Sequence, residues 1–105
     1  MANPRAGEVA IRLDGERRVM RLTLGALAEL EADLGGGGLV EMVRRFETGA
    51  FTTRDVLSVI VAGLRGGGWS GDARELLTAE IDGGVTGAAR AAAVLLVRAF
   101  SEPGG

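Results

Sequence analysis

Residues 8–22 decide the fold, and they read Glu-Val-Ala-Ile-Arg-Leu-Asp-Gly-Glu-Arg-Arg-Val-Met-Arg-Leu. On both sides of Asp14-Gly15 the apolar side chains alternate with other residues at a period of two, as in strands with one buried face. Asp-Gly is a dipeptide that tolerates positive φ at both central positions of a type I′ turn. The stretch therefore predicts a β-hairpin over 8–22. Because two strands alone are marginally stable, we expect the hairpin to pack on helices.

Beyond the hairpin, apolar residues recur at helical spacing between glycine-rich breaks. Thr23 and Thr52 are suited to N-cap the first and third helical segments. With Thr52 as N-cap, Asp55 would occupy N3, and Phe51 could pack on Val56 at N4. The helices are expected at about 24–34, 39–47, 53–65, 71–82 and 86–100. The chain is thus predicted to be a single α+β domain over 1–105, an N-terminal β-hairpin packed on about five short α-helices.

Two further patterns concern packing and charge within these helices. The third helix is apolar on nearly every side, so we expect neighbouring elements to enclose it. Glu41 and Arg45 are spaced i,i+4 and could pair on the outside of the second helix. The glycine runs Gly35–Gly38 and Gly66–Gly68 each follow a helix, not a strand, which indicates linkers or C-caps in place of phosphate-binding loops.

The composition lacks most of the side chains that enzymes use in catalysis. The chain contains no lysine, histidine, cysteine, tyrosine or glutamine, and its twelve basic residues are all arginine. It therefore lacks an imidazole base, a thiolate nucleophile, a Schiff-base amine and a phenol. We expect a binding protein that is not an enzyme, with no cofactor and no metal site.

Charge and hydropathy bear on the partners. The net charge is −2, and the predicted fourth helix carries Asp72, Glu75, Glu80 and Asp82, which would repel phosphates. No run of eighteen apolar residues is present, and the N-terminus lacks the apolar stretch of a signal peptide. We therefore expect neither a nucleic-acid nor a membrane partner, and a cytoplasmic location.

Glu31 is the one carboxylate that the helical pattern places among apolar residues, between Leu24 and Leu27. A buried charge is costly unless it is paired. We therefore expect a structural ion pair between Glu31 and a hairpin arginine. The arginines within reach are Arg12, Arg18 and Arg21.

The last predicted helix and the single tryptophan are the candidate partner-binding surface. Between 87 and 99 the only polar side chains are those of Arg90 and Arg98, so the helix is either enclosed or presents an apolar face to a partner. Trp69, between glycines and a helix cap, either covers the core or anchors an interface. The candidate residues are Trp69, Arg90, Val94, Val97 and Arg98.

Two stretches also resemble a known family: Gly-Glu-Val-Ala-Ile-Arg-Leu-Asp-Gly (7–15) and Arg-Leu-Thr-Leu-Gly-Ala-Leu-Ala-Glu-Leu-Glu-Ala-Asp-Leu-Gly (21–35). They are similar to the opening of the tail assembly chaperones of gene transfer agents and related long-tailed phages, in which such a hairpin leads through a Thr-x-Gly-Ala-Leu helix into a helical remainder. The Ala-Gly-Leu-Arg stretch at 62–65 agrees as well.

The resemblance implies a role in tail morphogenesis, with no catalytic residues. The implied partners are the tape-measure protein and tail-tube subunits, in the cytoplasm of the producing bacterial cell or in a virion-like particle. Members of the family are also labelled tail-tube proteins, so a structural tail component retained in the particle is the alternative. A small DNA-binding regulator is a more distant one, and a homo-oligomer is left open.

Overall fold

The N-terminal hairpin forms as the alternation predicts. In the computed structural model, which describes residues 7–34 and 38–100, β1 (Val9–Leu13) pairs antiparallel with β2 (Glu16–Met20). Leu13 lies opposite Glu16, which leaves a two-residue loop, and φ is positive at both Asp14 (52°) and Gly15 (82°). The predicted Asp-Gly turn is therefore confirmed.

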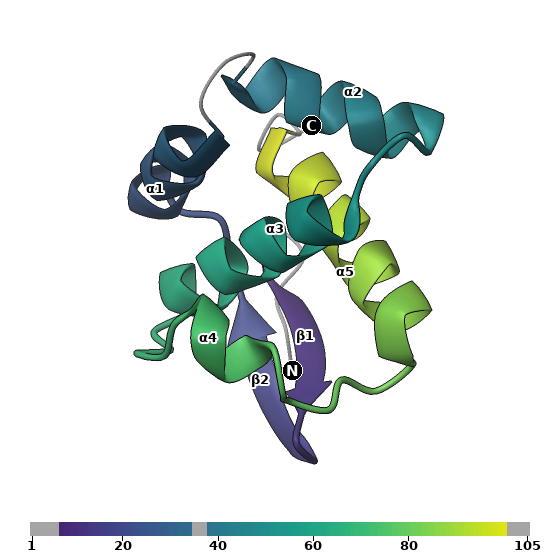
Figure 1. The fold of residues 1–105 in the computed structure, drawn as a ribbon. Coiled ribbons are helices and arrows are strands. Elements are labelled where there is room, and N and C mark those ends of the chain that lie inside the picture. The colour runs from purple at the N-terminus through teal and green to yellow at the C-terminus, as the bar shows by residue number, and fades with distance from the viewer. Residues whose placement is uncertain (1–6, 35–37, 101–105) are drawn as a thin grey trace.

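In the described residues five helices follow the hairpin, which confirms the α+β prediction (Figure 1). Their bounds are α1 (Leu24–Leu34), α2 (Gly38–Thr48), α3 (Thr53–Gly66), α4 (Ala73–Leu76) and α5 (Gly84–Phe100). Thr23 caps α1 by accepting a hydrogen bond from the Ala26 amide (3.1 Å). Thr52 caps α3 in a capping box with Asp55. Gly35–Gly37 lie outside the described residues.

The predicted helix at 71–82 is wrong in length, because α4 ends at Leu76. The chain beyond it runs along the tip of the hairpin. There Asp14 N–H donates to the Glu80 carbonyl (2.8 Å) and Asp82 N–H donates to the Arg12 carbonyl (3.2 Å). Extended backbone paired with the hairpin thus replaces the last turns of the expected helix.

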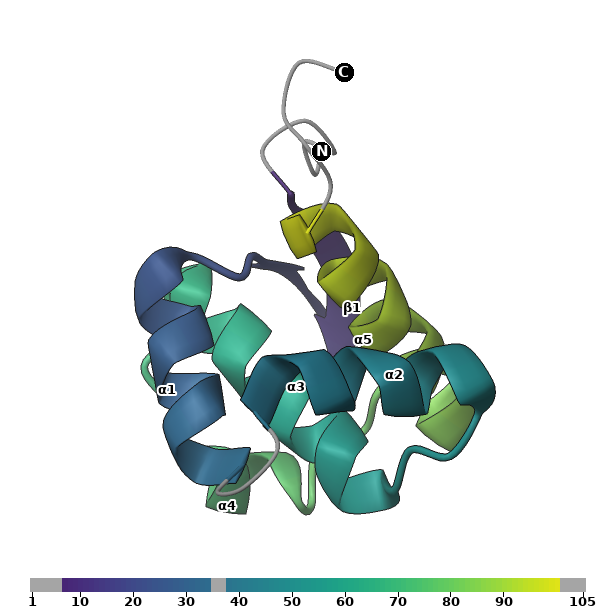
Figure 2. The ribbon, with the colours of Figure 1, turned by 90° about the horizontal axis from the view of Figure 1, so that it is seen from above.

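Helix α3 lies at the centre of the molecule, and it contacts β2, α1, α4 and α5 (Figures 1 and 2). The core that surrounds it is aliphatic and draws side chains from most elements. Its largest fully buried side chains are Met20, Leu30, Met42, Val59, Ile60, Leu64 and Leu95. The expectation that neighbours enclose the third helix is confirmed, with half-buried or exposed positions remaining on its outer side.

Three glycines let other elements approach the C-terminal half of α3. A Cβ added at Gly66 would lie 1.9 Å from the Arg21 carbonyl oxygen, and one at Gly67 would lie 2.0 Å from that of Val19. A Cβ at Gly63 would meet a Leu95 methyl carbon at 2.7 Å. The Gly63 carbonyl accepts a hydrogen bond from Arg21 N–H (2.9 Å). Gly66 and Gly67 thus do more than end a helix, because they bring the backbone of the hairpin into direct contact with it.

We predict that Gly66→Ala lowers the free energy of unfolding by about 2 kcal/mol, because the added methyl group overlaps backbone atoms that cannot rotate away. Denaturant unfolding followed by circular dichroism measures the change. Gly25→Ala is the matched control, since its Cβ would meet nothing nearer than 3.8 Å and alanine favours a helix by up to about 1 kcal/mol. Equal effects of the two substitutions would contradict the proposed contact.

Candidate functional site

Glu31 does not form the predicted ion pair. Its side chain is exposed, and within the described residues the structure shows no ion pair between it and Arg12, Arg18 or Arg21. Leu24, which the helical pattern places on the same buried stripe, is 86% exposed. The buried side of α1 runs through Ala26 and Leu30, with Leu27 partly buried against the core. The helix is therefore rotated about its axis from the predicted position, and Glu31 projects into solvent.

A different ion pair lies at a helix interface, where the sequence pattern does not indicate one. Arg45 of α2 contacts Asp55 of α3 through two parallel bonds, Nε to Oδ2 (2.8 Å) and Nη2 to Oδ1 (2.9 Å). Asp55 is the one buried charged side chain of the described residues, and its Oδ2 also accepts from Thr52 N–H (2.9 Å). The bidentate geometry is the strong form of this contact. Arg45 therefore pairs across the helices and not within α2 with Glu41.

The electrostatics of this pair favour charge on both partners. Burial alone would raise the pKa of Asp55, but hydrogen bonds from Arg45 and Thr52 and the Arg45 charge together lower it. The hydrogen bond to Asp55 in turn raises the pKa of Arg45. A carboxylate held ionised in this way joins α2 to α3 and is poorly suited to proton transfer near neutral pH.

The described part of the chain offers neither a metal cluster nor a membrane-spanning helix. In 7–34 and 38–100, no three acidic side chains lie close enough together to hold a metal ion. Every fully buried side-chain nitrogen or oxygen there has a hydrogen-bond partner. None of the helices in these ranges is long and apolar enough to cross a membrane.

The predicted binding residues of the last helix divide between its two sides. Arg90 and Val97 are exposed, and Val94 and Arg98 are half-buried. The Arg98 guanidinium donates to the Glu8 carbonyl, so this side chain holds the end of α5 to the start of β1. Helix α5 is therefore not enclosed: one side packs on the core and the other faces solvent.

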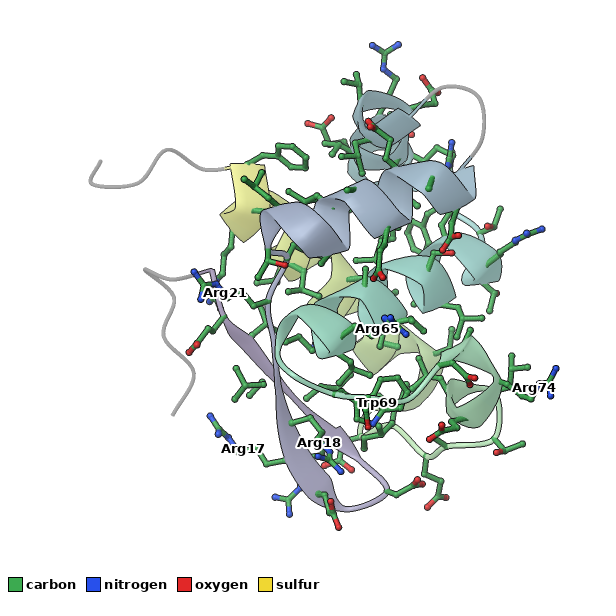
Figure 3. The ribbon with its side chains drawn as sticks, turned by 90° about the vertical axis from the view of Figure 1, so that its left-hand side faces the viewer. Arg17, Arg18, Arg21, Arg65, Trp69 and Arg74 are labelled. Atoms are coloured by element: carbon green, nitrogen blue, oxygen red, sulfur yellow. The ribbon has the colours of Figure 1, made fainter. Side chains whose placement is uncertain are left out.

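Trp69 is half-buried and packs on the core. Its ring lies against Gly71, where an added Cβ would come within 2.2 Å of Cζ2. Figure 3 shows Trp69 in the loop after α3, with Arg18 of β2 on one side and Arg65 of α3 on the other. The packing favours the interpretation that Trp69 covers the core. A role in partner binding stays a prediction.

Arg65 connects three elements beside Trp69. Its guanidinium pairs with Glu29 of α1, with Nη2 to Oε1 at 3.2 Å, and contacts the Gly71 carbonyl at 3.5 Å. The pair is exposed on both sides, so its contribution to stability is small. Arg17 and Arg74 point away from the body of the protein in the same view.

An apolar groove of about 600 Å³ lies where the sequence predicts no site. It is bounded by α3, the segment 76–83 and the start of α5. Its apolar lining includes Val56, Ile60, Leu76, Leu77, Val85 and Ala88. Leu77 is 68% exposed and Val85 is 69% exposed. The sequence does not indicate the groove, because its pattern predicts a continuous helix over 71–82.

Comparison with known proteins identifies the family. A family model described as "Phage tail tube protein, GTA-gp10" matches residues 6–102. The chain belongs to this family. The resemblance seen at 7–35 therefore extends over the hairpin and all the described helices, and the protein is related to the tails of phages and gene transfer agents. Searches of the curated proteins and of the solved structures gave no match.

The Arg45–Asp55 pair predicts a pH dependence of stability. The pKa of Asp55 is lower in the folded state, so its ionised carboxylate stabilises the fold at pH values above the ordinary aspartate pKa of about 4. This stabilisation is lost as the pH falls through the pKa of Asp55 in the folded state. Asp55→Asn should lower the free energy of unfolding at pH 7 by about 2 kcal/mol. The difference from the wild type should shrink below about pH 4.

Urea unfolding at a series of pH values measures this difference. Asp33→Asn makes the same chemical change at an exposed position of α1 and should leave the unfolding midpoint nearly unchanged. A constant difference between Asp55→Asn and the wild type from pH 7 to pH 3 would contradict the assignment.

Proposed function

We propose that this protein is a tail assembly chaperone, which binds the tape-measure protein and tail-tube subunits while the tail is built and does not remain in the particle. The proposal rests on family membership and on the distribution of exposed apolar side chains. The alternative is a structural tube component, which the description of the family favours. The two differ in the interfaces that each requires.

The exposed apolar side chains are the observation that carries the proposal. They lie on separate elements: Leu24 on α1, Val40 on α2, Leu77 after α4, and Val85, Val97 and Phe100 on α5. Permanent subunit interfaces bury large, continuous apolar areas. Scattered apolar side chains and an apolar groove suit smaller, reversible contacts, as a helper protein needs.

The edges of the hairpin support the same conclusion. The outer edge of β1 is occupied near the turn by the backbone of residues 80–82. The chain leaving β2 is bonded to α3 through Arg21 and Gly63. Both edges of this two-stranded sheet are therefore partly occupied by hydrogen bonds within the chain. Neighbouring copies have little free strand edge with which to pair into a continuous sheet, as the wall of a tube would need.

A DNA-binding role and an enzymatic role have less support. A helix-turn-helix protein places a recognition helix in the major groove, but α4 is only four residues long. We also propose that the protein is not an enzyme, because its side chains supply no nucleophilic thiolate, amine or imidazole and its buried carboxylate is paired.

Quantitative mass spectrometry of producing cells and of purified particles tests the proposal. We expect the protein in cells during tail assembly and no more than background amounts in particles. The tape-measure protein in the same samples controls for recovery. Many copies of this chain for each tape-measure protein in purified particles would establish the structural alternative instead.

A further inference from the structure

Two surfaces of this chain are apolar, exposed and opposite in charge. One is the groove between α3, residues 76–83 and the start of α5. The other is the outer stripe of α5, defined as Arg90, Ala93, Val97 and Phe100. The groove meets α5 near its start, at Val85 and Ala88, whereas the stripe begins at Arg90 and runs to Phe100 at the end of the helix. Because both surfaces include residues of one helix, their separation within a copy is fixed. One copy therefore cannot bring its own stripe into its own groove.

The groove is acidic at its edge. Among the described residues that line it, the only charged ones are Glu80 and Asp82. Asp82 lies 3.7 Å from the Arg12 guanidinium. The Glu80 carboxylate has no hydrogen bond or ion pair within the described part of the chain, although its backbone is bonded to Asp14. An occupant that is apolar and carries a basic group near one end would match this lining.

The outer stripe of α5 has that chemistry. Its four residues are spaced i, i+3, i+7 and i+10, which places them on one side of a helix. Val97 is 67% exposed and Phe100 is 52% exposed. Arg90 is the one charged member, and its guanidinium has no partner in residues 7–34 and 38–100. The stripe thus presents apolar side chains with a single positive charge at its N-terminal end.

We propose that the outer stripe of α5 from one copy occupies the groove of a second copy, with Arg90 beside Glu80. The contact is head-to-tail, because it joins two different surfaces. Each added copy then leaves one groove and one stripe open, so association continues until a ring closes or a chain grows. This inference goes beyond the proposed function, since it needs no other tail protein, and it can fail while that function stands.

Sedimentation velocity of the purified chain over a range of concentrations gives the first test. We expect species that grow with concentration. Val97→Glu blocks the stripe and Leu77→Glu blocks the groove, and each variant alone should be monomeric. Because both side chains are exposed, circular dichroism should show that each variant folds. Val40→Glu alters an equally exposed position of α2 outside both surfaces and should associate like the wild type.

Mixing the two blocked variants decides the geometry. The intact stripe of Leu77→Glu can enter the intact groove of Val97→Glu, so the mixture should form dimers and nothing larger. A mixture that stays monomeric would overturn the head-to-tail arrangement. A wild type that is monomeric at every concentration would overturn the proposal entirely and leave the groove to another partner. Equal loss of association in Val40→Glu would overturn the assigned surfaces.

A charge exchange tests the predicted pair and avoids substitutions in apolar positions. Arg90→Glu and Glu80→Arg should each weaken association at least about tenfold, which corresponds to roughly 1.4 kcal/mol. The double variant carries both changes in every chain and should recover most of the lost affinity. A double variant that is weaker than either single variant would overturn the pairing of these two residues.

Discussion

The direct contact between the hairpin backbone and α3 is the constraint on which the rest of the fold depends. A two-stranded sheet is marginal alone, and this one is held where Arg21 N–H donates to the Gly63 carbonyl (2.9 Å). The contact is possible only because Gly66 and Gly67 present no side chain to the carbonyls of Arg21 and Val19. Once the hairpin lies against α3, its apolar face closes the core with α5.

The position of the hairpin also shapes the surfaces that partners can reach. Residues 80–82 pair with the tip of β1, so the chain after α4 crosses the molecule in an extended form and leaves a groove beside α3. The Arg45–Asp55 pair joins the start of α3 to α2. The one buried carboxylate of the described residues thus has a structural role. Among the described residues, the exposed surface carries several large apolar side chains together with acidic residues and arginines.

Local signals were predictable, and contacts between distant elements were not. Asp14-Gly15, Thr23 and Thr52 act through neighbouring backbone groups, so the sequence indicates them directly. The apolar stripe of α1 was predicted correctly at Leu30 but not at Leu24, because leucine counts as more apolar than alanine, yet Leu24 projects outward and Ala26 packs inward. The Arg45–Asp55 pair and the groove depend on how helices meet. Helical spacing alone left open whether the last helix is enclosed, and the structure shows that Arg90 and Val97 are exposed.

Native-state hydrogen exchange at the Arg21 amide tests the central contact most directly. If the hairpin and α3 form one cooperative unit, this amide exchanges only on global unfolding. Its free energy of opening should then equal that of the Val59 and Ile60 amides, which lie in the buried part of α3. A free energy of opening at the Arg21 amide several kcal/mol lower than at the Val59 amide would show that the hairpin opens independently and would contradict this account.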